Sequence, residues 1–139
     1  MDYAAVVEQA PVSIILSDRE GRITAWNRAS EDLFGFAAGE VMGQSLDVII
    51  PEHLRKAHWE GFDRSLASGT TKYAGRVMTT RAVHKDGRRL YVDFSFGMLK
   101  DAGGSVVGVM AIGRDGTERF LKEKEMRARM AAQEQPPKP

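Results

Sequence analysis

The stretch Leu90-Tyr-Val-Asp-Phe-Ser-Phe-Gly-Met-Leu99 decides the fold, because large apolar side chains occupy every second position. A β-strand points successive side chains to opposite faces, so a period of two residues is typical of a strand with one buried face. The face that we expect to be buried carries Leu90, Val92, Phe94, Phe96 and Met98. The sequence therefore predicts a long strand here, with one side against a core.

Four more strands are predicted from apolar, β-branched runs that end at turn sequences. They lie at Val12–Ser17, Ile23–Asn27, Tyr73–His84 and Ser105–Arg114. Short turns that contain glycine join the first two strands and the last three. Such short connections make antiparallel neighbours, so we expect a hairpin near the N-terminus and a three-stranded meander later in the chain.

Helical patterns fill the rest of the sequence. Short pieces at Arg28–Phe36 and Gly39–Met42 precede a longer helix at Glu52–Ala67, which Pro51 opens and Gly69 ends. Two strands, several helices and three strands is an α+β order, which predicts an antiparallel sheet with helices on one face.

Each end of the chain is also expected to be helical. Asp2 is placed to cap a helix over Asp2–Gln9. From Thr117 onward, favourable i,i+4 charge pairs predict a second terminal helix, at Glu118/Lys122, Glu123/Arg127 and Glu125/Arg129. We divide the chain into a cap helix at 1–10, one α+β domain at 11–116, and a C-terminal helix with a Pro-rich, disordered tail at 117–139.

Composition excludes several classes of function. The chain has 139 residues, no cysteine and a formal net charge of +1, so thiolate metal sites, thiol nucleophiles and a flavin–cysteine photoadduct are ruled out. No basic stripe suggests nucleic acid, and no apolar run approaches the roughly 20 residues of a membrane span. No catalytic motif is present, so we expect a cytoplasmic protein that is not an enzyme.

One helix carries the candidate site. Within Glu52–Ala67, the residues Leu54, His58, Phe62 and Leu66 recur every four positions, which places them along one side. If the apolar members face the sheet, His58 points inward as well. A neutral imidazole in an apolar pocket is a suitable axial ligand for an iron porphyrin. The alternative is a histidine on a helix edge that is hydrogen-bonded or solvated.

The order of these motifs resembles the PAS family of sensory domains. Gly21-Arg-Ile-Thr-Ala-Trp-Asn27 looks like the family's second strand, and Ile49-Ile-Pro51 looks like the entry to its long helix. Gly108 through Arg119, with Asp115-Gly-Thr117, resembles the last strand and its junction with an output helix. The resemblance covers about residues 5–120. It implies a five-stranded antiparallel sheet, a ligand pocket beside the long helix, and homodimers that act on a fused or separate output partner.

The long helix also resembles that of the haem-binding PAS oxygen sensors, which place an arginine six residues after the axial histidine. Here His58 is followed by Arg64, so the resemblance implies His58 as the ligand of a haem b iron and Arg64 beside a propionate. Arg76, preceded by Gly75, matches the arginine that hydrogen-bonds dioxygen in those sensors. Leu54, Phe62, Phe94 and Phe96 are the predicted walls of the pocket.

Other interpretations stay open at this stage. Trp26 and Asn27 match positions that touch a flavin such as FAD in some relatives, but we favour their interpretation as a core tryptophan and a helix-capping asparagine. Arg76 is alternatively an exposed strand residue, or one that forms a salt bridge with Asp93 or Glu60. The whole chain is alternatively a dimerisation module without any cofactor, or a sensor of another small molecule.

Overall fold

A computed structural model describes residues 1–134 and contains a single five-stranded antiparallel sheet in the order β2-β1-β5-β4-β3. The strands are β1 (Ser13–Ser17), β2 (Ile23–Trp26), β3 (Met78–Val83), β4 (Arg89–Lys100) and β5 (Val106–Asp115). The helices are α1 (Tyr3–Gln9), α2 (Arg28–Phe34), α3 (Ala38–Val41), α4 (Arg55–Ser68) and α5 (Thr117–Glu134), with 3-10 turns η1 (Leu46–Ile49) and η2 (Glu52–Leu54). The predicted α+β order and antiparallel sheet are confirmed. The predicted disordered tail, residues 136–139, lies outside the described residues.

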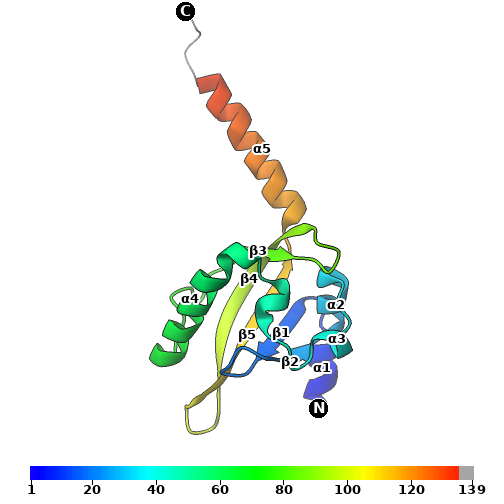
Figure 1. Cartoon of the computed structure of the whole chain (residues 1–139), viewed down its shortest axis with the longest axis vertical. Coiled ribbons are helices and arrows are strands. Elements are labelled where there is room, and N and C mark those ends of the chain that lie inside the picture. Colours follow the sequence, from blue (N-terminus) through cyan, green and yellow to red (C-terminus); the bar gives the residue numbers. More distant parts are fainter. Residues whose placement is uncertain (135–139) are drawn as a thin grey trace, which may run out of the picture.

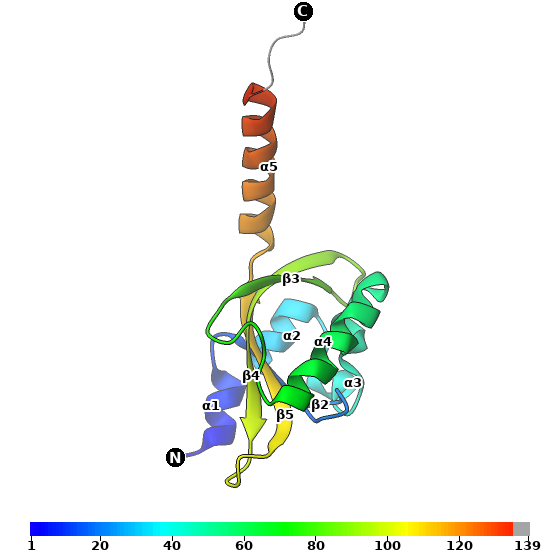
Figure 2. The same cartoon turned by 90° about the vertical axis from the view of Figure 1, so that its left-hand side faces the viewer.

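The helices are divided between the two faces of the sheet (Figures 1 and 2). The segment between β2 and β3, with α2, α3 and α4, covers one face, which we call the inner face. Figure 2 shows α1 on the opposite, outer side of the sheet, and α5 extending away from the globule. The two terminal helices are therefore not part of the layer that covers the inner face.

The strand β4 has the predicted alternation. Leu90, Val92 and Phe94 are buried against the helices, and Phe96 and Met98 continue the same inner face with partial exposure. Its neighbours align in regular antiparallel register, with Thr80 opposite Val92 and Gly113 opposite Phe94. The packing at Gly113 is tight, because a side chain there would overlap the Phe94 ring at 2.6 Å.

The third strand begins later than the sequence predicted. Residues Tyr73–Arg76 form a turn, in which the N–H of Arg76 donates to the carbonyl of Tyr73 at 3.0 Å. Gly75 in this turn has a φ of +73°, which is unsuited to an extended strand. The strand therefore starts at Met78, and the prediction that Gly75 and Arg76 lie on it was wrong.

The end of the sheet covered by α2 and α3 is densely packed. Its core contains Ile15, Ile23, Trp26, Phe34, Val41, Ile49 and Phe94, all less than a tenth exposed. Asn27 lies beneath it with its polar atoms satisfied. Its Oδ1 accepts from the N–H groups of Ile14 and Ser30, and its Nδ2 donates to the carbonyls of Val7 and Val12. Asn27 thus caps α2 and ties α1 to the domain.

By contrast, α4 is held at a distance from the sheet. Among its 14 residues only Phe62 is buried. Trp59 anchors its first turns, because the indole Nε1 donates to Asp47 at 2.7 Å and the ring lies over Gly21. A side chain at Gly21 would meet that ring at 2.2 Å, so a glycine is required there. The remainder of α4 has little contact with the core.

The last helix, α5, has no buried residue along its 18 positions. Two of the three predicted i,i+4 pairs form, Glu118 with Lys122 and Glu125 with Arg129. The predicted pairing of Glu123 with Arg127 was wrong, since Glu123 accepts from Arg119 at 2.9 Å, one turn earlier. No helix within residues 1–134 combines the length and the apolar character that crossing a membrane requires.

Candidate functional site

A cavity of about 1170 Å³ lies between α4 and the inner face of the sheet. Ligand pockets in proteins commonly measure about 300–1,000 Å³, so this space is large enough for a sizeable organic ligand. The sheet contributes a mainly apolar wall, formed by Ile15, Met78, Phe96, Met98, Val109 and Ala111. The helix and the loop after it contribute the opposite wall. Several of these residues are exposed, including Ser68, Thr70 and Lys72, so the cavity opens to solvent at that end.

His58 faces this cavity, as the sequence predicted from its spacing. Its Nδ1 is buried and has no hydrogen-bond partner. The ring packs edge-on against Trp59, with 4.6 Å between centroids, and at a tilt beside Phe62, at 6.1 Å. Aromatic packing therefore positions the imidazole, whereas no hydrogen bond from the protein satisfies Nδ1.

Burial lowers the pKa of His58 below its usual 6.5, because desolvation disfavours the charged ring; the negative charge of Asp47 acts in the opposite direction. The imidazole is therefore neutral near pH 7 and keeps a free lone pair. Such a ring can accept a hydrogen bond or coordinate a metal ion. A metal-ligating histidine commonly donates its second ring N–H to an acceptor, and Nδ1 of His58 has none in the structure.

Of the other predicted site residues, Leu54, Phe62 and Phe96 line the cavity together with His58. Phe94 lies elsewhere. It is only 4% exposed and packs between Phe34 and Phe96, at centroid distances of 6.5 and 5.4 Å. The structure thus assigns Phe94 to the packed core, and Phe96 marks the boundary where the cavity begins.

The two predicted arginines have different positions. Arg64 is exposed but lines the cavity, with its Nη2 group lying back over Gly61, 3.8 Å from where a side chain would begin there. Arg76 is exposed in the turn before β3 and does not belong to the cavity wall. Its predicted contact with a bound gas would require this turn to move inward. The suggested partner of Arg76, Asp93, is instead bound by Arg119.

Trp26 and Asn27 are a core tryptophan and a helix-capping asparagine, as their structural interpretation predicted. Trp26 is 4% exposed, packs at 5.3 Å from Phe34 and donates from Nε1 to the carbonyl of Phe36. Asn27 is a helix cap with its polar atoms engaged. Neither residue lines the cavity beside His58.

Sequence reasoning missed part of the cavity wall. The face of α4 follows steps of four, four and three residues through Ala57, Gly61, Ser65 and Ser68, and Leu66 lies off it. Steps of four residues drift by about 40° each on a 3.6-residue helix, which carries Leu66 away from the line that begins at Leu54. Small residues at these spacings were a visible signal. Residues 70–73 in the following loop have no periodicity that could have indicated them.

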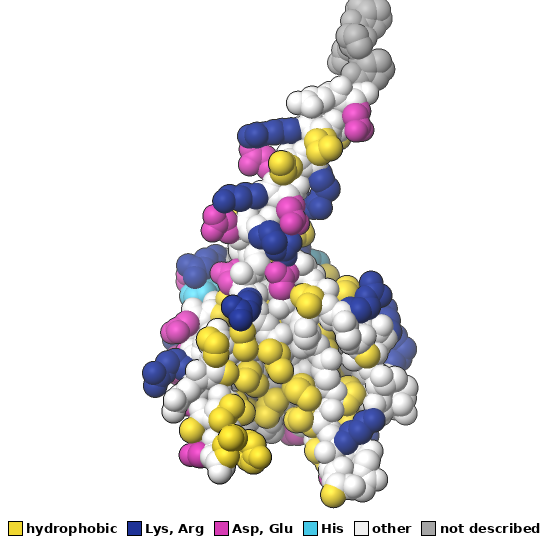
Figure 3. Space-filling model, turned by 180° about the vertical axis from the view of Figure 1, so that it is seen from behind, with side chains coloured by type: hydrophobic (Ala, Val, Ile, Leu, Met, Phe, Trp, Pro, Cys, Tyr) yellow, Lys and Arg dark blue, Asp and Glu magenta, His cyan; other side chains and the backbone are white. Residues whose placement is uncertain are grey.

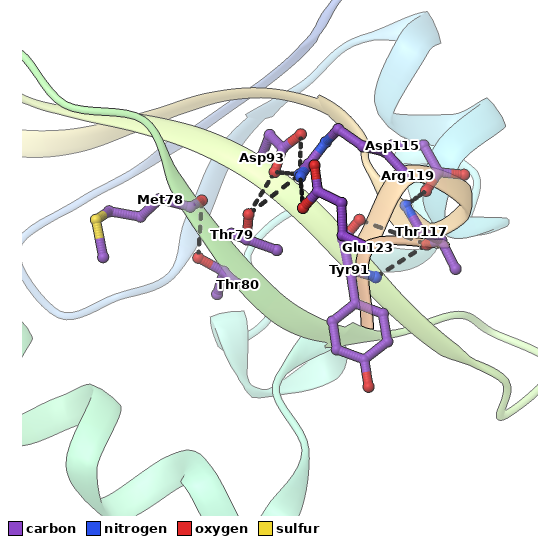
Figure 4. A network of polar contacts seen from close by, with 9 residues as sticks. All are labelled: Met78, Thr79, Thr80, Tyr91, Asp93, Asp115, Thr117, Arg119 and Glu123. Atoms are coloured by element: carbon purple, nitrogen blue, oxygen red, sulfur yellow. Dashed lines mark hydrogen bonds and ion pairs between the residues drawn. The ribbon is translucent and has the colours of Figure 1, made fainter. Parts of the chain in front are cut away.

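The strand β3 joins the cavity to the last helix (Figure 4). Thr79 belongs to the strand that walls the cavity, but its side chain points to the outer face of the sheet, where its hydroxyl donates to Asp93 at 2.7 Å. The same carboxylate accepts from Arg119 on α5, at 2.6 and 2.8 Å. Burial alone would raise the pKa of Asp93, but hydrogen bonds from Thr79 and Arg119 hold that pKa below its usual value.

The junction at the base of α5 is closely fitted. Thr117 bridges to Tyr91, because its Oγ1 accepts from the Tyr91 N–H at 2.9 Å, and the Phe120 ring stacks on Tyr91 at 3.9 Å. A side chain at Gly116 would collide with the carboxylate of Asp93 at 2.6 Å. The first turn of α5 is therefore fixed to β4, while the rest of the helix is exposed.

The sequence profile of the PAS fold matches residues 7–120, and the chain belongs to this family. The PAS domain of a protein from Colwellia psychrerythraea is similar in structure, with a TM-score of 0.72 and 21% identity. That likeness covers 84% of this chain and 95% of that one. An RNA-binding light-oxygen-voltage receptor also reaches a TM-score of 0.72, with 22% identity, over 93% of this chain and 36% of the other. These likenesses confirm the predicted fold.

Among curated proteins, the oxygen sensor protein DosP of Escherichia coli strain K12 is 25% identical over 125 residues, or 90% of this chain. The chain spans 15% of the length of DosP. The similarity therefore concerns one domain of a larger sensor. The chain is a PAS sensory module, and the cavity beside His58 is its candidate ligand site.

Proposed function

We propose that this PAS module senses a small ligand that occupies the cavity between α4 and the sheet, in contact with His58. The observation that carries the proposal is the cavity of about 1170 Å³ whose wall includes the imidazole of His58, a ring that burial keeps neutral near pH 7. A ligand that hydrogen-bonds to this ring, or coordinates it, would also fill the space.

Haem b is the ligand that the proposal places first. The neutral imidazole of His58 is a suitable axial ligand, and the sheet side of the cavity is largely apolar. Arg64 borders the same cavity with a positive charge that complements a propionate. When bound, the iron would supply a coordination position for a diatomic gas. The similarity to an oxygen sensor supports this choice.

A dimerisation module without a ligand is the competing function. Such a module has no need of a space of this size, and an apolar wall that faces an open space buries no surface. The well-packed core beside α2 and α3 shows that this chain fills its interior elsewhere. The cavity therefore favours a ligand sensor, of haem or of another small molecule.

The signal would leave the cavity through β3. A ligand that shifts the strand β3 would alter the hydrogen bond from Thr79 to Asp93, and Asp93 is the carboxylate that binds Arg119 on α5. Ligand occupancy would thus shift the equilibrium between orientations of α5 by acting on its first turn.

Homodimerisation through the outer face is the second part of the proposal. Figure 3 shows hydrophobic side chains gathered on the side of the globule turned away from the viewer in Figure 1. Tyr3 and Val6 of α1 and Ile112 of β5 are exposed large hydrophobic residues. A groove lined by Leu16 and Met42 lies beside α1, and a two-fold interface needs both a protruding and a receiving surface on the same face.

Titration with hemin tests the ligand site. We expect a shifted Soret band in the native protein, its loss in His58→Leu, and its retention in the control His53→Leu, because His53 is exposed and outside the cavity. Calorimetry with decanol then probes the cavity for apolar ligands in general. A protein that binds neither hemin nor decanol contradicts the proposal. For the dimer, sedimentation should show association that Ile112→Asp abolishes.

A further inference from the structure

The charged residues of the cavity wall all have the same sign. Arg64 and Lys72 are its fully charged members, and none of the 23 lining residues is an aspartate or a glutamate. Glu60 and Asp63 belong to the same helix, but both are exposed and neither lines the cavity. Asp47, the carboxylate whose charge acts on His58, accepts a hydrogen bond from the indole of Trp59 and does not line the cavity.

The two cations enter the cavity wall from neighbouring segments of the chain. Arg64 belongs to the last two turns of α4, and Lys72 to the loop after Gly69, where the helix ends. Both side chains are exposed, which places them at the mouth. The same part of the wall contains the hydroxyl residues Ser65, Ser68, Thr70 and Thr71.

Neither cation is neutralised by the protein. Within residues 1–134, no carboxylate lies within ion-pair distance of Arg64 or Lys72. Lys72 instead lies over the ring of Tyr73, at 4.9 Å from its centroid, and Tyr73 also lines the cavity. Lys85, by comparison, is paired with Glu40 at 2.7 Å. The mouth therefore keeps two positive charges available beside an apolar interior.

We infer that the cavity selects a ligand with an apolar body and a carboxylate, and that Arg64 and Lys72 bind the carboxylate at the mouth while the body lies against Phe96 and Met98. This inference rests on the proposed ligand site and adds the chemical class of the ligand. Lys72 is the residue that it adds, since neither helix spacing nor the histidine–arginine pattern points to it. Haem propionates and a simple fatty acid share this chemistry.

The test compares decanoate with decanol, which have the same apolar body and differ in charge at neutral pH. Isothermal titration calorimetry of the whole chain should show that decanoate binds about tenfold more tightly, as two exposed charge contacts would produce. Added salt should reduce this preference, because charges at an open mouth are screened. The double variant R64Q/K72Q should bind decanoate only as well as decanol, with its affinity for decanol unchanged.

The control variant K56Q/K124Q removes the same charge at exposed positions outside the cavity, and it should keep the preference for decanoate. His58→Leu distinguishes haem from a fatty acid as the source of the carboxylate, because it should abolish hemin ligation and leave the decanoate preference intact. Equal binding of decanoate and decanol, or an unchanged preference in R64Q/K72Q, overturns the inference while the ligand site stands. A chain that binds neither probe nor hemin overturns the ligand site as well.

Discussion

The end of the sheet covered by α2 and α3 and the end covered by α4 are made of similar residues but are filled differently. At the first end, Trp26, Phe34 and Phe94 pack ring against ring with almost no exposure. At the second, Phe62 and Phe96 border a cavity of about 1170 Å³. The difference lies in the side chains opposite the sheet, because α4 presents Ala57, Gly61 and Ser65 where a packed helix would present large apolar residues. We call these two regions the packed half and the hollow half.

Truncation of one phenylalanine in each half should give the largest contrast. Phe34→Ala should lower the free energy of unfolding by about 4 kcal/mol, because its fully buried ring leaves a closed void. Phe62→Ala should cost less, about 2 kcal/mol, because its ring already borders an open space. Urea unfolding at equilibrium measures both values. Equal losses would show that the two halves are packed alike.

Enlarging a small residue should reverse the contrast. Ala82→Leu adds three carbons to a site that is 2% exposed within the packed half, so overpacking should lower the free energy of unfolding by about 2 kcal/mol. Ala111→Leu points the same atoms into the cavity and should be neutral or stabilising by up to about 1 kcal/mol. Thermal unfolding of the pair provides the measurement. A destabilised Ala111→Leu would mean that the cavity is closed in solution.

The pH dependence of stability should reveal the histidine of the hollow half. Because burial lowers the pKa of His58 in the folded chain, the unfolded chain binds a proton more readily once the pH falls below about 6.5. Stability should therefore decrease as the pH falls from 6.5 toward the folded pKa, and this contribution should be constant above 6.5. His58→Leu should remove this part of the slope. Urea unfolding at a series of pH values tests it, and an unchanged slope in the variant argues against a buried imidazole.

The smallest effect is expected where the hollow half meets α5. Thr79→Val removes the hydroxyl that donates to Asp93 and should change the free energy of unfolding by less than about 0.5 kcal/mol, since the site is at the surface. Hydrogen exchange in the first turn of α5 should nevertheless become faster. Thr24→Val, at an exposed position on β2, is the control. Unchanged hydrogen exchange in Thr79→Val would show that the cavity and α5 are not coupled through this hydrogen bond.

The packed half was predictable from sequence because its signals are local and periodic. The alternation over residues 90–98 identified the inner face of β4, and the capping role of Asn27 follows from its position before Arg28. The four-residue spacing also predicted correctly that His58 faces the sheet, since the face of a helix is a local property.

The hollow half was only partly predictable, because a cavity depends on how far two elements stand apart. Phe94 and Phe96 occupy equivalent positions in the pattern of β4, yet one is core and the other is cavity wall. The distinction arises from where α2 ends and α4 begins above them. The start of β3 was misplaced for a related reason, since the turn at Gly75 interrupts a run that reads as continuous strand. Neither fact is contained in one segment of sequence.

The exposed helix α5 would amplify a small tilt at its base into a larger displacement of its far end. Its 18 residues extend for about 27 Å, at 1.5 Å per residue, and only its first turn is fixed to the sheet. A tilt of about 10° at that base would displace the far end by about 5 Å. A small adjustment at Asp93 would thereby be converted into a movement comparable to the rise of one helical turn. The junction at Gly116 and Thr117, and not the size of the ligand, would then determine how far the end of α5 moves.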